Sequence, residues 1–235
     1  MKVLHLISLS SVGGVERRFA SFWKYITTNP KHKQQHFFLN LQKSIHPNLE
    51  IHDNNYYQYK KFKSISIPKF LRKFIFKFFY DKHKFNRIII WNEFGNIHEL
   101  LPLFKNSIVI HHESGSAFTK KRKCDIDHYL KYIDLVVANA NSTKKCIESY
   151  LFPEDKIRIV RTSLRKELEN ICANKPNIKK HIIFGTLSTL SPRKGLPLLF
   201  HAIKDICSAY PDFKLSIAGK GSMESELREL ANSLN

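Results

Sequence analysis

A lysine and two pairs of glycines lie at places in the sequence where a phosphate group could be bound. Lys194 falls in residues 191–195 (SPRKG), between an apolar run at 182–184 and an apolar-periodic helix. A second apolar run, residues 213–218, ends in Gly219 and Gly221. A helix start offers unpaired N–H groups and partial positive charge, so a nearby ammonium group predicts a cradle for a diphosphate. The glycines would let a ligand approach the backbone closely.

An ordinary interpretation of the same residues is also open. Lys194 could be a solvated surface lysine, and the glycines could only form turns. The sequence contains no Walker motif and no GxGxxG motif. Spacing alone therefore does not decide between the two interpretations.

The first apolar run of the chain is also followed by glycines. Gly13 and Gly14 come after residues 3–9 and directly before a helix that we expect to begin near Val15. Strand, glycine turn and helix start is again the geometry of a phosphate site, although a glycine pair more often makes a tight connection. Glu16 and Arg17 would project from the first turn of this helix.

His111, His112 and Glu113 form a third candidate cluster, and Gly115 follows them. They come directly after an apolar run at 107–110, which predicts a buried strand. At the carboxyl end of a parallel strand, histidine and glutamate are well placed for catalysis or for binding hydroxyl groups. A solvated loop histidine is the alternative, and the pattern does not show which histidine points inward.

Alternating strands and helices must position these residues. We predict buried strands at 3–9, 37–41, 87–92, 107–110, 157–160 and 213–218, and residues 182–218 form a complete βαβ unit. Helices are expected at 67–84, from a cap at 141–143 to 150, and at 223–234, whereas 48–63 shows no period and is predicted to be a loop. Strands between helices indicate a parallel sheet.

The helix expected at 67–84 combines aromatic and basic residues. Its apolar residues recur on one face, and its basic residues occupy the rest: Phe70, Leu71, Phe74, Ile75, Phe78 and Phe79; Lys69, Arg72, Lys73 and Lys77. This composition is typical of an interfacial membrane anchor. The alternative is a helix docked on the sheet of the first domain with its lysines in water.

The charge balance indicates anionic partners. The 235 residues contain 39 Lys+Arg against 20 Asp+Glu, a net charge of +19. A basic nucleic-acid-binding protein is one candidate class, but the chain lacks RNP, zinc and helix-turn-helix signatures, so we expect no nucleic-acid partner. Lipid headgroups and phosphorylated sugars remain as candidates.

Metal, redox and membrane-span signals are weak. The four cysteines are far apart, and the 12 histidines form no HExxH motif, so no metal site is predicted. No apolar run approaches the roughly 18 residues that cross a bilayer, and no signal peptide is recognised. A cytoplasmic location is expected, at the inner face of the cytoplasmic membrane if the basic aromatic helix binds lipid.

Several of these motifs, taken in order, resemble family-4 glycosyltransferases, among them those of lipopolysaccharide and capsule synthesis. The resemblance is carried by residues 191–195, by Leu198, Leu199 and Ala202, and by 215–221 with Leu227. The Gly13-Gly14 turn and the His111–Gly115 segment with residues 116–118 are similar to the family's loops at the donor diphosphate and the acceptor. The resemblance covers nearly the whole chain.

The resemblance implies an α/β fold of the GT-B type. It implies an N-terminal acceptor-side Rossmann-like domain at 1–165, a linker at 166–180, and the first part (β-α-β-α) of a donor-side Rossmann-like domain at 181–235. The implied enzyme is a retaining hexosyltransferase that needs no cofactor. Its substrates would be a nucleotide diphosphate sugar, such as a UDP- or GDP-sugar, and the hydroxyl of a glycan or glycolipid acceptor.

The resemblance also implies roles for individual residues. Catalysis would be carried out by His111, His112 and Glu113. The donor would be bound by Gly13, Gly14, Thr189, Arg193, Lys194, Gly219 and Gly221. The acceptor would be bound by Glu16, Arg17 and Gly115.

The sequence departs from the family pattern in three places. The Glu-x7-Glu motif of complete members is absent, Thr189 stands where an arginine is usual, and 161–163 replaces an Asn-Gly turn. Arg193 could substitute for the missing arginine. We therefore expect a C-terminally truncated chain, and an inactive fragment that only binds acceptor is the main alternative to an active enzyme.

Overall fold

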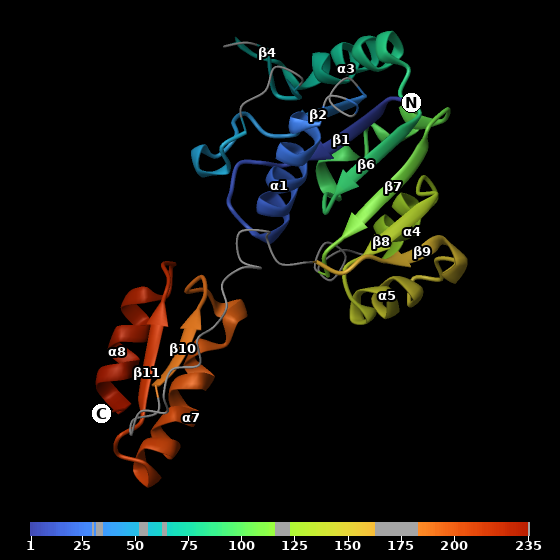
Figure 1. Cartoon of the computed structure of the whole chain (residues 1–235). Helices are drawn as coiled ribbons and strands as arrows, with labels where there is room; N and C mark the ends of the chain where they lie inside the picture. The colour runs from blue at the N-terminus through green and yellow to red at the C-terminus, as the bar shows by residue number, and fades with distance from the viewer. Residues whose placement is uncertain are drawn as a thin grey trace. The chain divides into compact units, whose positions relative to one another are not determined.

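This computed structural model describes residues 1–29, 31, 35–51, 56–62, 65–115, 123–162 and 183–234. The chain divides into two compact units, Met1–Glu169 and Asn170–Asn235 (Figure 1). Each unit is described by itself. The linker predicted at 166–180 and the loop predicted at 116–118 lie outside the described residues, so the domain boundaries remain a prediction.

A seven-stranded parallel sheet forms the centre of unit 1. Its strands follow the order β3-β2-β1-β6-β7-β8-β9. They are β1 (Val3–Ile7), β2 (His36–Asn40), β3 (Tyr56–Gln58), β6 (Arg87–Trp91), β7 (Ile108–Glu113), β8 (Leu135–Ala138) and β9 (Ile157–Ile159). A short antiparallel pair, β4 (Lys61–Phe62) and β5 (Ile65–Ser66), follows β3. The parallel sheet predicted from the apolar runs is confirmed.

Helices lie on both faces of this sheet. They are α1 (Gly14–Thr28), α3 (Lys69–His83), α4 (Lys123–Leu130) and α5 (Asn141–Glu148), with the short 3-10 helices η1 (Pro47–Leu49), η2 (Gly95–Ile97), η3 (Leu101–Phe104) and η4 (Glu154–Lys156). Phe19 and Trp23 of α1 belong to one buried cluster, whereas Phe76 of α3 and Tyr129 of α4 belong to another. Successive side chains of a strand point to opposite faces, so both faces of the sheet are buried.

The strand order reverses between β1 and β6. The chain moves outward from β1 through β2 and β3 on one side, and then from β6 through β9 on the other. In open parallel sheets, the crevice at the carboxyl ends of the two strands at this switch point is where ligands bind. Gly13 and Gly14 follow β1 and Asn92 follows β6, so the topology places them at this end of the sheet.

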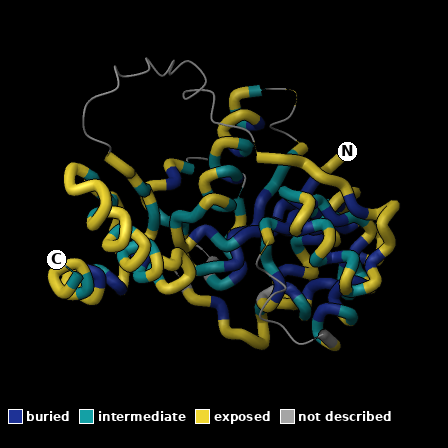
Figure 2. The backbone as a smooth tube through the Cα atoms, turned by 90° about the horizontal axis from the view of Figure 1, so that it is seen from below, coloured by how far each residue is buried: buried dark blue, intermediate teal, exposed yellow. Residues whose placement is uncertain are grey.

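Helix α3 packs through a face that shares only Phe79 with the apolar face predicted for it. Its buried side chains are Phe76 and Tyr80. Three phenylalanines of the predicted face remain exposed, with 77%, 77% and 75% of their surface accessible: Phe70, Phe74 and Phe78. Figure 2 shows the contrast between the buried strands of unit 1 and its more exposed outer helices. Packing against the sheet therefore leaves the outer aromatic residues of α3 in contact with solvent.

Two local predictions are wrong. Residues 141–143 do not cap α5, because the N-cap is Ala140, which makes no side-chain bond, and the Thr143 hydroxyl bonds to Asn139 at 2.8 Å. The predicted loop at 48–63 contains β3, which pairs with β2 at the edge of the sheet. A three-residue edge strand is too short to give a periodic pattern.

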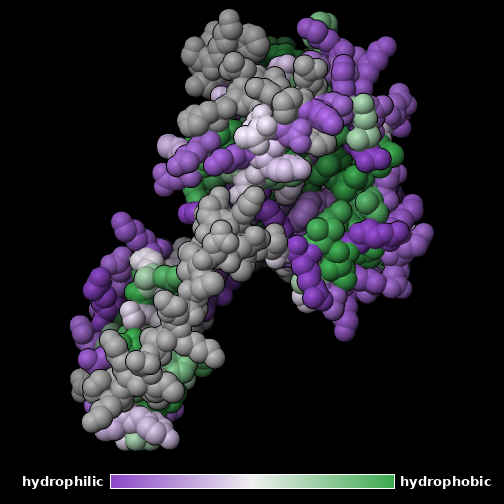
Figure 3. Space-filling view, in the orientation of Figure 1, coloured by the Kyte–Doolittle hydropathy of each residue, from purple (hydrophilic) through white to green (hydrophobic). Residues whose placement is uncertain are grey.

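Unit 2 is a small βαβα segment. Strand β10 (Ile183–Leu187) pairs in parallel with β11 (Lys214–Ala218), with η5 (Pro192–Lys194) and α7 (Leu196–Ala209) between them and α8 (Glu224–Leu234) after them. Its buried core consists of Leu190, Leu196, Met223 and Leu227. Hydrophilic side chains cover much of the described surface in Figure 3, with hydrophobic patches between them. The predicted order of elements is confirmed.

Candidate functional site

Residues from distant parts of unit 1 meet beyond the carboxyl ends of its strands. We call Arg18, Asn92, His112, Ser114 and Thr162 the strand-end cluster. Arg18, on α1, donates from Nη2 to Ser114 Oγ at 2.7 Å and from Nη1 to Thr162 Oγ1 at 2.6 Å. Ser114 follows β7 and Thr162 lies beyond β9, so one guanidinium joins the ends of two strands to the helix that follows β1.

Asn92 links the loops after β6 and β7. Its backbone is left-handed, with φ of 51°, a conformation that asparagine adopts more readily than most residues. The Asn92 side-chain oxygen accepts the Ser114 N–H at 3.0 Å, and the Asn92 N–H donates to the His112 carbonyl at 2.8 Å. These bonds fix the loop that carries Ser114 toward Arg18.

His112 is the histidine of the pair that belongs to this cluster. Its ring stacks on Trp91 with a centroid distance of 5.0 Å and an interplanar angle of 11°. Burial, and then the nearby Arg18 charge, lower the pKa of His112 to about 4. Nδ1 of His112 is buried and has no partner among the described residues. At neutral pH the ring is therefore uncharged, and one of its two hydrogen-bonding positions is buried and unsatisfied.

His111 and Glu113 point to the opposite face of the sheet. His111 Nε2 lies 2.9 Å from Glu113 Oε2, and His111 Nδ1 lies 2.7 Å from the Tyr129 hydroxyl. The other Glu113 oxygen accepts the Gly115 N–H at 2.7 Å, and Gly115 has a positive φ of 96°. Both side chains are buried. They hold the strand and its loop in place, and only His112 is left as a candidate for contact with a substrate.

The Arg18 guanidinium is suited to binding an anion. Its Nε is buried and has no partner in the part of the chain that the structure describes. Burial lowers the pKa of Arg18, but a guanidinium stays charged at physiological pH. A charged fork held by two hydroxyl acceptors can recognise a phosphate or carboxylate oxygen. We did not predict Arg18 from the sequence. The one feature of the sequence that could have indicated Arg18 is its place in the helix after the glycine turn, one residue beyond Arg17.

The glycine turn before α1 is closed by a glutamate. The Gly13 N–H donates to Glu16 Oε2 at 3.0 Å, and Ser11 Oγ donates to Glu16 Oε1 at 3.0 Å. Glu16 thus caps the helix start with its own carboxylate, as an acidic residue in a first turn commonly does. Arg17 is exposed. A side chain added at Gly14 would meet no atom within 4 Å, so a ligand could approach there.

In unit 2, the predicted lysine lies beside a helix start. Lys194 ends η5, Gly195 follows with a left-handed φ of 63°, and α7 begins at Leu196. Thr189, Arg193 and Lys194 are all exposed. The turn therefore presents two cationic side chains next to the first N–H groups of α7.

The glycines after β11 pack against the loop after β10. A Cβ at Gly219 would overlap the Ser188 carbonyl, and one at Gly221 would overlap the Leu190 backbone. Ser188 N–H donates to the Ala218 carbonyl at 3.1 Å, which holds the two loops together. Packing within the chain thus accounts for both glycines, and their contact with a donor remains a prediction. Ser188 Oγ is buried without a described partner, a further polar group that the sequence did not reveal.

The described residues provide neither a metal cluster nor a membrane span. They contain no group of three or more His, Cys, Asp or Glu side chains that could hold a metal ion. None of the helices within the described ranges is long and apolar enough to cross a membrane.

Comparison with known proteins shows what the C-terminal part of the chain is similar to. Residues 169–235 match the family model described as glycosyl transferases group 1. An uncharacterized glycosyltransferase of Methanocaldococcus jannaschii is 28% identical over 116 residues, which is 46% of this chain and 29% of that protein. The resemblance predicted from residues 191–221 is confirmed by these matches.

Solved structures show the fold of the whole chain. The lipopolysaccharide outer core galactosyltransferase WaaB, in its apo form, aligns with a TM-score of 0.71 at 16% identity, over all of this chain and 65% of that one. HepE from Anabaena, in complex with UDP, aligns with a TM-score of 0.74 at 14% identity, over all of this chain and 66% of that one. The predicted α/β fold of the GT-B type is confirmed. The chain spans about two thirds of the length of these structures.

Proposed function

We propose that this chain, whose residues 169–235 match the group 1 glycosyl transferases, transfers a sugar from a nucleotide diphosphate sugar to an acceptor hydroxyl. The observation that carries the proposal is that the matched segment contains the Lys194 turn at the start of α7. HepE, which is similar in fold, has been solved with UDP and with UDP-glucose. A UDP- or GDP-sugar is therefore the proposed donor.

The donor diphosphate would be bound by the turn before α7. When the sugar leaves, negative charge develops on the diphosphate, and cationic groups and N–H dipoles that are already in place stabilise it. Lys194 and Arg193 supply the charge, and the helix start supplies the N–H groups. Arg193 would take the place of the arginine that Thr189 replaces.

The acceptor would be bound by the strand-end cluster. His112 is neutral at pH 7 and can share a hydrogen bond with a sugar hydroxyl through Nδ1. Arg18 would hold an anionic group of the acceptor. Glu113 is buried against His111 and Gly115, so it offers no free carboxylate for a double displacement. We propose a retaining transfer that proceeds without a covalent carboxylate intermediate.

We place the reaction in cell-surface polysaccharide or lipopolysaccharide synthesis, with a glycolipid acceptor at the inner face of the cytoplasmic membrane. The support is the exposed Phe70, Phe74 and Phe78 on a helix that also carries Lys69 and Lys73. Apolar rings with neighbouring lysines favour binding to anionic lipid. Wild-type protein should sediment with anionic liposomes at low salt, and a failure to do so would remove the membrane part of the proposal.

A turnover assay tests the enzymatic proposal. The protein is incubated with UDP- or GDP-sugars and glycolipid extracts, and nucleotide diphosphate release is measured. We expect turnover with one donor, at least a tenfold loss in Lys194→Met, and no loss in the matched surface variant Lys204→Met. Acceptor binding without turnover would support the inactive-fragment alternative instead. Tighter binding to unrelated oligonucleotides than to any nucleotide sugar would support the nucleic-acid alternative.

A further inference from the structure

A groove lies between the edge strand β3 and helix α3 in unit 1. Its volume is about 620 Å³, within the range of roughly 300–1,000 Å³ that is typical of ligand sites. None of its lining residues belongs to the strand-end cluster. The groove is therefore a separate feature of unit 1, and the proposed transfer reaction does not use it.

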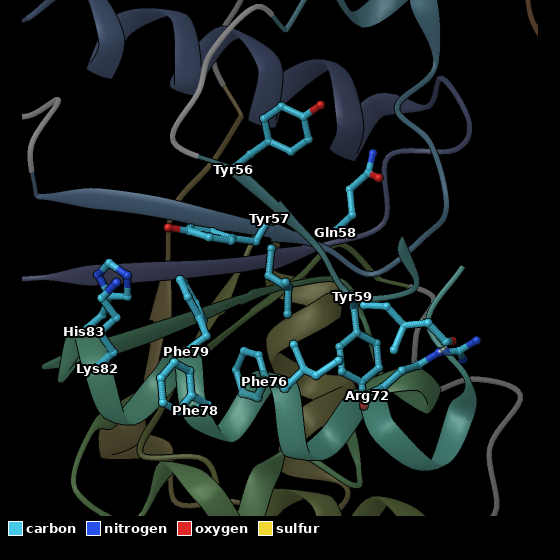
Figure 4. A pocket seen from close by; sticks show the side chains of 13 residues that line it. Tyr56, Tyr57, Gln58, Tyr59, Arg72, Phe76, Phe78, Phe79, Lys82 and His83 are labelled. Carbon is cyan, nitrogen blue, oxygen red and sulfur yellow. Dashed lines mark hydrogen bonds between the residues drawn. The ribbon is translucent and has the colours of Figure 1, made fainter. Parts of the chain in front are cut away.

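The lining of the groove is mainly apolar and aromatic. Tyr57 of β3 and Phe79 of α3 are in contact, with ring centroids 4.0 Å apart, and Tyr59 meets Phe76 edge-on at 6.2 Å. Figure 4 shows Tyr57 of the strand and Tyr59, one residue beyond it, next to the phenylalanines of the helix. Ile75 also lines it. Such walls favour an apolar occupant.

Cationic side chains stand at the two ends of the groove. Figure 4 shows Arg72 at one end and Lys82 at the other. His83 lies beside Lys82, and burial together with the nearby lysine charges lowers its pKa, so it adds no positive charge at neutral pH. Arg72 is held in place because its Nε donates to the Ile67 carbonyl at 2.9 Å. Lys82 is exposed. Helix α3 carries five Lys or Arg residues and one acid, Asp81, which pairs with Lys77. An anionic headgroup would therefore complement the ends of the groove.

The groove is continuous with an exposed aromatic stripe on α3, which consists of Phe70, Phe74 and Phe78. Phe78 both lines the groove and is exposed, and Phe74 and Phe70 lie one and two turns before it on the same face of the helix. An apolar ligand could pass from a surface that contacts Phe70 and Phe74 into the groove without crossing a polar barrier on this helix.

We propose that this groove binds one acyl chain of an anionic phospholipid, with the phosphate held by Lys82. A peptide would bring an N–H and a carbonyl at each residue, which need partners that the aromatic walls do not provide and that only the free edge of β3 could offer. An alkyl chain needs none. The inference rests on the membrane contact proposed above, and it extends that contact from a surface to a defined binding site for a single lipid.

Dodecyl phosphate below its micelle concentration is a suitable probe, because it separates the groove from vesicle binding. We expect saturable one-to-one binding by calorimetry and much weaker binding of the uncharged dodecyl maltoside. Ile75→Trp should fill the groove and weaken binding at least tenfold. Leu71→Trp is the matched control, because Leu71 is similarly exposed on the same helix (40% against 44%) but does not line the groove. Lys82→Gln should weaken binding several-fold, and Lys73→Gln should not.

The stripe is tested in parallel. Phe74→Ser should lower sedimentation with anionic vesicles and leave dodecyl phosphate binding unchanged. The proposal is overturned if dodecyl phosphate does not saturate, if Ile75→Trp binds as wild type does, or if an apolar peptide displaces the probe at lower concentration. If the probe fails to bind while the wild type still sediments with vesicles and turns over a nucleotide sugar, the groove proposal fails and the proposed function stands.

Discussion

The buried His112 predicts a specific loss of stability in acid. The structure lowers its pKa from an ordinary 6.5 to about 4, mainly by burial. The unfolded chain therefore binds a proton in a range of pH where the folded chain does not. The part of the free energy of unfolding that depends on a neutral His112 is fully present above about pH 6.5 and is lost as the pH falls toward 4. The pKa of His112 differs by roughly 2.5 between the unfolded and folded chains, and at 1.36 kcal/mol for each pKa unit this lowers the free energy of unfolding at pH 4 by about 3 kcal/mol.

His112→Phe removes the titrating group but keeps a planar ring next to Trp91. Any change in packing is independent of pH, so it cancels when the free energies of unfolding at pH 7 and pH 4 are subtracted. We expect this difference to be about 3 kcal/mol smaller in His112→Phe than in wild type. Urea denaturation followed by tryptophan fluorescence measures unit 1 alone, since both tryptophans, Trp23 and Trp91, belong to it.

The control for this experiment is His128→Phe. His128 is exposed in the same unit, so the variant should show the same dependence on pH as wild type. His5 is also buried, and its pKa is well below the usual value because of burial and the neighbouring His36, so part of the acid sensitivity will persist in every variant. If His112→Phe loses as much stability in acid as wild type, the burial argument for a neutral His112 is refuted.

Three further substitutions test separate parts of the account. Gly14→Ala should keep or slightly raise the melting temperature, because its Cβ meets no atom, but it should weaken acceptor binding. Unchanged acceptor affinity would show that no ligand approaches Gly14. Arg18→Lys keeps the charge but loses the planar fork that bonds Ser114 and Thr162, so kcat/KM should fall roughly 10- to 100-fold while the melting temperature falls by only a few degrees. Wild-type kinetics would exclude Arg18 from the site. Gly221→Ala forces a Cβ onto the Leu190 backbone, so the free energy of opening of unit 2, measured by hydrogen exchange, should fall by roughly 1–3 kcal/mol. Unaltered protection would contradict that packing.

The sequence alone was sufficient to predict a strand or helix where many residues contribute to one pattern. The apolar runs that became β1, β6 and β7 are buried on both faces, and a continuous apolar run is the expected sign of such a strand. The βαβα order of unit 2 was also readable, because strand and helix periods alternate there with turn residues between them.

Details that depend on tertiary contacts were not predictable in this way. The apolar face assigned to α3 was the wider one, yet the sheet buries Phe76 and Tyr80, because the choice of face depends on the shape of the surface beneath the helix. His111 and His112 look alike in sequence, and only the register of β7 sends one to each face of the sheet. Arg18 was missed because its partners, Ser114 and Thr162, are about 100 and 140 residues away.

Titration of UDP and GDP into the purified protein tests the central claim most directly, that the turn before α7 binds the diphosphate of a nucleotide sugar. We predict saturable binding of one of the two nucleotides, weakened at least tenfold in Lys194→Met and unchanged in Lys204→Met. Binding of neither nucleotide, or equal affinity in both variants and in wild type, would contradict it.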